Sequence, residues 1–109
     1  MTLIPLISAS PYTLLYFYPK DDTPGCTLEA QDFTRLKGEF AELRIQIVGI
    51  SQDSESSHAK FCNKYNLGIK LISDEDGSLH EQFGVIGEKK NYGKIYIGVI
   101  RSTFMLNSA

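Results

Sequence analysis

A cysteine in the first turn of a predicted helix, behind an apolar strand, is the feature that most constrains this chain. The strand covers residues 14–18, and Pro19 ends it because proline lacks the N–H that a strand ladder needs. Thr23 then precedes Pro24 as an N-cap precedes a first-turn proline. On this count Cys26 lies where unpaired backbone N–H groups and the helix dipole favour a thiolate over a thiol.

Strands and helices alternate along the chain, which predicts an α/β fold with right-handed crossovers and partly parallel strands. The remaining predicted strands cover residues 45–50, 69–72 and 95–106. The predicted helices cover residues 24–36, with a second piece after Gly38, then 57–65, capped by Ser54, and 78–83. We expect Leu28, Phe33 and Leu36 to face the core, and residues 87–94 to form a loop. The predicted organisation is an N-terminal segment, 1–13, and one domain, 14–109.

Composition argues against several classes of function. The net charge of −2 and the absence of a basic stripe argue against a nucleic-acid partner. Residues 1–7 are apolar, but they lack a positive flank and contain Pro5, so we expect neither a signal peptide nor a membrane anchor. Two cysteines without an export signal indicate a reducing compartment, the cytoplasm, in which a disulfide is transient.

A metal or nucleotide site has weak support in the sequence. His58 and Cys62 are one helical turn apart, and with His80 and Cys26 they allow a zinc hypothesis. The sequence has no C-x-x-C, and a metal on Cys26 would leave the helix terminus unused, so we expect no metal. The missing C-x-x-C also argues against a thioredoxin-type oxidoreductase. The stretch 89–94 lacks the Gly-Lys-Ser/Thr ending of a phosphate-binding loop, so we expect no cofactor.

Three blocks of the sequence resemble the Q-type, or bacterioferritin comigratory protein, branch of the peroxiredoxins. They are residues 15–33, which contain the motif P-x-x-x-T-x-x-C, residues 65–74, and residues 89–104. The resemblance implies a thioredoxin-like fold. It also implies a thiol-dependent peroxidase that reduces hydrogen peroxide and organic hydroperoxides through a sulfenic acid on Cys26. We expect a monomer that is recycled by thioredoxin or a similar dithiol.

The resemblance implies roles for four residues around Cys26. Arg101 matches the active-site arginine of the family, although from the residues alone a solvent-facing position on a strand is as good a hypothesis. Thr23 would orient the peroxide, or only cap the helix. Pro19 would shield the sulfur from water, or only end the strand. Glu29 would help to hold the arginine, or be a surface charge.

Cys62 is the candidate resolving cysteine. Many Q-type relatives carry this cysteine five positions after the first one, where this chain has Gln31, and others carry it in a later helix that corresponds to residues 57–65. A lone cysteine beside Phe61 can also be a small core residue, so both alternatives stay open. Pairing with Cys26 would require local unfolding, because Cα atoms more than about 7 Å apart cannot be bridged without backbone movement.

Family members open with a further N-terminal segment and continue past the arginine strand with a strand and a long helix, whereas this sequence stops at Ala109. We therefore expect a fold that is incomplete at both ends, with an exposed sheet edge and uncovered apolar surface. A rival hypothesis follows, in which the chain is a catalytically impaired thioredoxin-fold fragment that acts as a binding or scaffold module. Peroxidase activity separates the two hypotheses.

Overall fold

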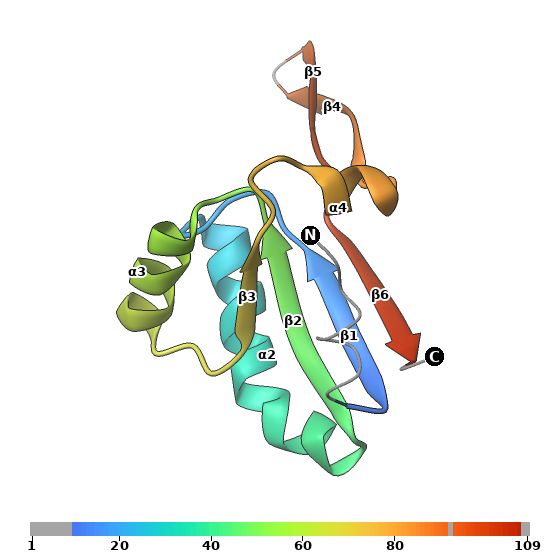
Figure 1. Cartoon of the computed structure of the whole chain (residues 1–109). Coiled ribbons are helices and arrows are strands. Elements are labelled where there is room, and N and C mark those ends of the chain that lie inside the picture. The colour runs from blue at the N-terminus through green and yellow to red at the C-terminus, as the bar shows by residue number, and fades with distance from the viewer. Residues whose placement is uncertain (1–9, 92, 108–109) are drawn as a thin grey trace.

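The computed structural model describes residues 10–91 and 93–107 and is built around a four-stranded sheet of order β3-β2-β1-β6 (Figure 1). Strands β1 (Tyr12–Phe17), β2 (Ile45–Ser51) and β3 (Lys70–Ser73) are parallel, and β6 (Ser102–Asn107) runs antiparallel to β1. Parallel neighbours need crossover connections, which α2 (Pro24–Glu42) and α3 (Glu55–Tyr65) supply. The predicted α/β class is confirmed.

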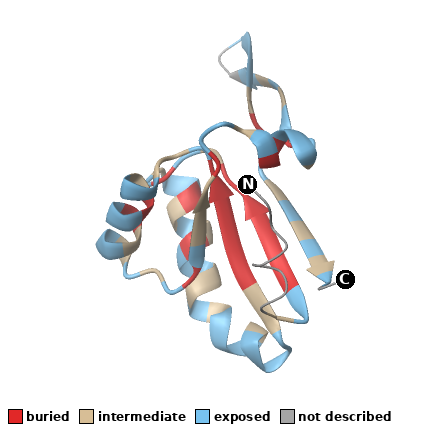
Figure 2. Ribbon diagram, in the orientation of Figure 1, coloured by how far each residue is buried: buried red, intermediate tan, exposed pale blue. Residues whose placement is uncertain are grey.

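The two central strands are buried on both faces, as Figure 2 shows. Alternate residues of β1 point to opposite faces. Leu14 and Tyr16 pack in one cluster with Cys26 of α2 and Phe61 of α3. The other face forms a second cluster that includes α4 (Ser78–Gln82), with the members Leu15, Phe17, Val48, Ile50, Leu79, Val85 and Val99. Burial on both sides explains the nearly continuous apolar sequence of these strands.

The residues after Gly38 are helical as predicted, but they continue α2 without interruption, so the predicted division into two pieces is wrong. A Cβ added at Gly38 would meet nothing within 4 Å, and a glycine inside a helix costs only about 1 kcal/mol, which packing elsewhere outweighs. The buried side of α2 carries Cys26 and Ala30, with Phe33 partly buried beside them. Leu28 does not face the core as expected but is 61% exposed, because it lies off this stripe of every third or fourth residue.

The predicted loop at residues 87–94 is also wrong, because a hairpin of β4 (Ile86–Asn91) and β5 (Lys94–Val99) stands there. Strand β4 has no apolar face, and its lysines made the sequence look like a polar loop. The predicted strand 95–106 is two strands, β5 and β6, separated at residues 100–101. This break takes Arg101 out of the strand ladders. Figure 1 shows the hairpin projecting from the end of the main sheet.

Strand β1 starts two residues before the predicted domain boundary and ends at Phe17, shortly before Pro19. The first nine residues of the predicted N-terminal segment lie outside the described residues. None of the helices in the described part of the chain has both the length and the apolar character that a membrane span requires.

Candidate active site

Cys26 is the third residue of α2 and is 1% exposed. The helix begins at Pro24, and Thr23 before it has the extended backbone of an N-cap, with φ −100° and ψ 154°. Both features agree with the sequence prediction. The sulfur therefore belongs to the first helical turn, where backbone N–H groups lack helical acceptors and the dipole favours an anion.

Arg101 donates a hydrogen bond from Nη2 to the Cys26 sulfur, at 3.2 Å. Gly25 provides the room for this approach, because a Cβ at Gly25 would lie 3.3 Å from the same nitrogen. Burial opposes the charge of Arg101, but the hydrogen bond to Cys26 and the nearby Glu29 outweigh it and raise the pKa of Arg101. A permanent cation thus lies directly against the sulfur.

Glu29 lies one helical turn after Cys26 and accepts a hydrogen bond from Nη1 of Arg101 at 2.6 Å. The guanidinium therefore uses two different nitrogens, one for the carboxylate and one for the sulfur. This forked arrangement fixes the plane of the guanidinium in a way that a lysine ammonium cannot reproduce.

Thr23 and Pro19 lie in the segment between β1 and α2. The Thr23 hydroxyl does not cap the helix as the sequence allowed, because it donates to the carbonyl of Lys20 at 2.8 Å. Its oxygen keeps lone pairs that can accept a hydrogen bond from a ligand. Pro19 is half-buried just beyond β1. The proposed shielding of the sulfur by Pro19 stays a prediction.

Cys62 lies in α3, is half-buried, and has a free thiol, as does Cys26. Burial, and then the charge of Asp21, raises the pKa of Cys62. At neutral pH this thiol therefore carries its proton. The two cysteines belong to different helices, and the structure holds no bond between them.

Sequence reasoning missed a buried network that joins residues 18–23, the segment between β1 and α2 (the active-site segment), to α3. Asp21 accepts hydrogen bonds from the Tyr18 hydroxyl at 2.6 Å and the Ser57 hydroxyl at 2.7 Å, and its carboxylate lies 2.7 Å from Nδ1 of His58. The other His58 nitrogen lies 3.0 Å from the carbonyl of Ile72. With acceptors at both nitrogens, the ring is placed as an imidazolium beside a carboxylate.

The pKa shifts of the pair have opposite directions. Burial disfavours the charge of His58, but the hydrogen bond and charge of Asp21 outweigh it and raise the pKa of His58. Burial likewise opposes the charge of Asp21, while its bonds from His58, Tyr18 and Ser57 lower the pKa of Asp21. No spacing rule could reveal this pair. The only signal in the sequence was an otherwise unexplained histidine one turn before Cys62.

A second contact between the same segments follows at the next residue. Asp22 accepts hydrogen bonds from Lys64 at 2.8 Å and from the Tyr65 hydroxyl at 2.6 Å. These contacts and those of Asp21 fall on either side of Cys62 in α3. The segment that leads into the Cys26 helix is thus attached to the Cys62 helix at two points.

The histidines and cysteines do not assemble as a zinc site. His58 packs against Tyr18 on one face of the sheet, whereas His80 packs against Phe17 on the other and lies 2.7 Å from Asp74. In the described ranges, no three His, Cys, Asp or Glu side chains are placed to hold a metal ion.

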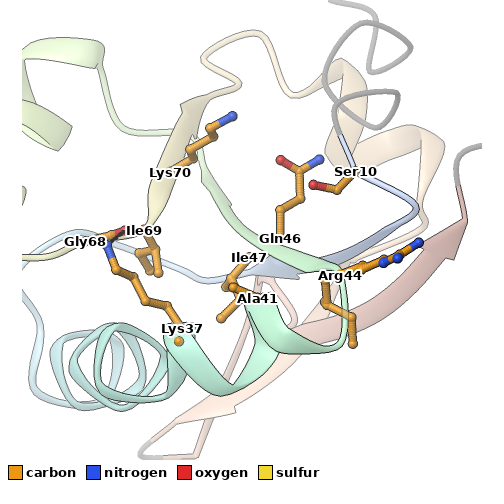
Figure 3. A pocket seen from close by; sticks show the side chains of 11 residues that line it. Ser10, Lys37, Ala41, Arg44, Gln46, Ile47, Gly68, Ile69 and Lys70 are labelled. Atoms are coloured by element: carbon orange, nitrogen blue, oxygen red, sulfur yellow. Dashed lines mark hydrogen bonds between the residues drawn. The ribbon is translucent and has the colours of Figure 1, made fainter.

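A hollow at the far end of α2 is separate from the cysteine site. It lies between the C-terminal half of α2 and strands β2 and β3, with Lys37 and Gly68 at one side and Arg44 at the other (Figure 3). Its lining includes none of the residues that surround Cys26.

The chain resembles known proteins over most of its length. Residues 6–109 match the AhpC/TSA family. Peroxiredoxin Bcp of Bacillus subtilis is 51% identical over 96 residues, which are 88% of this chain and 61% of that protein. Peroxiredoxin Bcp of Xanthomonas campestris is 48% identical over 99 residues, 91% of this chain and 62% of that protein. The chain thus spans about three-fifths of the length of these relatives.

Solved structures of the Xanthomonas campestris bacterioferritin comigratory protein have the same fold. The one described with trapped intermediate and ligand complexes in alkyl peroxide reduction aligns with a TM-score of 0.83 at 45% identity, covering 89% of this chain and 62% of that chain. Two more carry a serine in place of a cysteine, at positions as far apart in sequence as Cys26 and Cys62. The expected thioredoxin-like fold is confirmed, and this chain belongs to the AhpC/TSA family, in the Q-type branch of the peroxiredoxins.

Proposed function

We propose that this chain is a thiol peroxidase that reduces hydrogen peroxide and organic hydroperoxides with Cys26 as nucleophile. The observation that carries the proposal is the contact of 3.2 Å between Arg101 and the Cys26 sulfur at the start of α2. A guanidinium and a helix N-terminus both stabilise an anion, and the thiolate is the reactive form of cysteine. The alkyl peroxide reduction described for the Xanthomonas relative supports the same chemistry.

The reaction follows from these positions. The Cys26 thiolate attacks the terminal oxygen of the hydroperoxide, an S–O bond forms, and the O–O bond breaks. The attacked oxygen keeps its hydrogen, so Cys26 is left as a sulfenic acid, and the second peroxide oxygen takes a proton from solvent and leaves as water or alcohol. Arg101 can stabilise the negative charge as it moves from sulfur to the leaving oxygen. The free lone pairs of the Thr23 hydroxyl would orient the peroxide beside the sulfur.

We further propose that Cys62 resolves the sulfenic acid by forming a disulfide with Cys26, which thioredoxin or a similar dithiol then reduces. The matching spacing of the two substituted cysteines in the Xanthomonas structures supports this pairing. Because the cysteines belong to two separate helices, local unfolding is part of the cycle.

The test is mass spectrometry of the intact chain after one equivalent of hydrogen peroxide, with and without a trapping agent for sulfenic acid. We expect an adduct on Cys26, followed by a Cys26–Cys62 disulfide in the peptide map. Cys26→Ser removes all reaction, whereas Cys62→Ser keeps the first step and accumulates the sulfenic acid or a higher oxide.

Two outcomes would contradict parts of the proposal. If peroxide leaves Cys26 unmodified, the chain is not a peroxidase, and the binding-module hypothesis takes its place. If Cys26 forms a disulfide with an external thiol while Cys62 can still be alkylated, the enzyme uses one cysteine and Cys62 is a core residue.

A further inference from the structure

Tyr16 of β1 carries a buried hydroxyl that has no hydrogen-bond partner within the part of the chain that the structure describes. The residue is 1% exposed and belongs to the same core cluster as Cys26. Its ring packs against Phe33 of α2, with centroids 4.7 Å apart. A buried hydroxyl without a partner destabilises the folded state, and phenylalanine would fill the same space without that cost.

The hydroxyl reaches across β2 toward β3. Gly49 of β2 makes this possible, because a Cβ at Gly49 would lie 2.8 Å from the Tyr16 hydroxyl oxygen and 2.9 Å from a methyl group of Leu71 in β3. Helix α3, which carries Cys62, packs against β3. The hydroxyl of Tyr16 therefore lies in the core between the helix of Cys26 and the side of the sheet that supports the helix of Cys62.

Electrostatics agrees with this placement. Burial first, and then the charges of Glu29, Cys26 and Cys62, raise the pKa of Tyr16. The geometry is given by the core cluster that Tyr16 shares with Cys26 and by the approach of its hydroxyl to Leu71 in β3. Because the phenolate is strongly disfavoured, Tyr16 is a neutral O–H group at physiological pH, with one proton to donate and lone pairs to accept another.

Resolution of the sulfenic acid needs such a group. Burial raises the pKa of Cys62, so this thiol is protonated at neutral pH and must lose its proton as it attacks. The oxygen on Cys26 must gain a proton to leave as water rather than as hydroxide. A group that passes a proton between these two sites avoids both charged species.

We propose that the Tyr16 hydroxyl relays a proton from Cys62 to the departing sulfenic oxygen while the Cys26–Cys62 disulfide forms. This inference rests on the proposed role of Cys62. In the step, an S–S bond forms and the S–O bond of Cys26 breaks. Tyr16 gives its proton to the leaving oxygen and receives the thiol proton of Cys62. Cys62 is oxidised, the sulfenic sulfur is reduced, water is released, and the tyrosine is unchanged.

Tyr16 is placed for this role better than the neighbouring phenol. It lies on β1, which is paired with β2 on one side and β6 on the other, so it stays in place while the helices open (Figure 1). The Tyr18 hydroxyl, by contrast, already donates to Asp21 at 2.6 Å.

The test is Tyr16→Phe in the full chain, with Tyr12→Phe as the matched control on the same strand, where the side chain is 48% exposed. Rapid quenching and mass spectrometry follow sulfenic acid formation and disulfide formation separately. We expect Tyr16→Phe to form the sulfenic acid within about twofold of the wild-type rate but the disulfide at least about tenfold more slowly. The solvent deuterium isotope effect on disulfide formation should be lost, and the unfolding temperature should be equal or higher. Tyr12→Phe should match the wild type in every measurement.

Disulfide formation at the wild-type rate in Tyr16→Phe would overturn the relay. Equal slowing of both steps would also overturn it, because Tyr16 would then act on the peroxide step or on the fold. Failure of the proposed function has a different signature: the wild type forms no Cys26–Cys62 disulfide, and Cys62→Ser accumulates no more sulfenic acid than the wild type. That result overturns both proposals.

Discussion

Replacing Asp21 by asparagine removes one charge of the buried pair that joins the active-site segment to α3. The side chains of His58 and Asp21 are only 6% and 4% exposed, so water cannot compensate for the loss. Breaking a buried ion pair by removing one partner costs about 3–5 kcal/mol. A total stability of about 5–15 kcal/mol is usual, so the variant loses a large part of its free energy of unfolding.

The loss converts to a measurable shift in unfolding temperature. With an unfolding entropy of about 2.1 cal/mol/K per residue, a chain of 109 residues has about 0.23 kcal/mol/K in total. We therefore expect Asp21→Asn to unfold roughly 13–22 °C below the wild type, as measured by circular dichroism. Asp32→Asn is the control, because Asp32 forms an exposed pair of 3.6 Å with Arg35 in the described part of the chain, and the stability of this variant should change by less than about 0.5 kcal/mol.

The pH dependence gives a sharper test of the same pair. The pKa of His58 is raised in the folded state, so its stabilisation is complete below the unfolded value of about 6.5 and is lost as pH rises through the folded value. The pKa of Asp21 is lowered, so its contribution is complete above its unfolded value of about 3.9 and is lost as pH falls through the folded value. The pair therefore stabilises the chain most between about pH 4 and 6.5.

In Asp21→Asn the slope of the free energy of unfolding against pH should reverse between pH 6 and 8. Burial is the largest influence on His58, and without the Asp21 carboxylate it lowers the pKa of His58. The free energy of unfolding of this variant therefore rises with pH. Urea unfolding at several pH values measures this slope. An unchanged slope, or a loss of stability below about 1 kcal/mol, would refute the assignment of a charged His58–Asp21 pair.

Three further variants test the geometry of the site. Arg101→Lys keeps the charge but loses the fork that joins Cys26 to Glu29, so the rate of sulfenic acid formation in stopped flow should fall by about 10- to 100-fold with little change in unfolding. Thr23→Val should slow the same step and lower stability by about 1 kcal/mol, and a loss of stability alone would limit the hydroxyl to its bond with the loop. Gly49→Ala would place a Cβ 2.7 Å from the Tyr16 ring, and denaturant unfolding should show a loss of about 1–3 kcal/mol.

The local part of the site could be predicted from the sequence because it depends on neighbouring residues. Proline restricts the backbone of Thr23 before it, and the helix start then fixes Cys26 in the first turn. The use of the Thr23 hydroxyl could not be predicted in the same way. A cap bond and a bond to the Lys20 carbonyl are both within reach of that side chain, and only the loop conformation chooses between them.

The long-range part depends on topology that no sequence window contains. Arg101 reaches Cys26 because the extended strand is interrupted between β5 and β6. The sequence of that region, by contrast, is typical of one continuous apolar strand. Asp21 meets His58 because α3 crosses over the sheet to lie beside the active-site segment. Strand β4 could not be predicted from an apolar pattern, because pairing with β5 rather than burial holds it in place and its lysines resemble a loop sequence.

The ends of the two cysteine helices differ in a way that connects stability with chemistry. The Ser54 hydroxyl caps helix α3 by accepting a hydrogen bond from the Ser57 N–H at 3.1 Å. The helix also has an acidic residue in its first turn and a left-handed Asn66 at its C-terminus. Helix α2 has no side-chain cap and no acidic residue in its first turn. A cap is worth about 1 kcal/mol, so α2 starts with a weaker turn. A capping oxygen or carboxylate there would compete with the sulfur anion for the same backbone N–H groups. The weaker turn therefore leaves those groups without a side-chain acceptor, and it lowers the free energy needed for the local unfolding that the proposed resolution step requires.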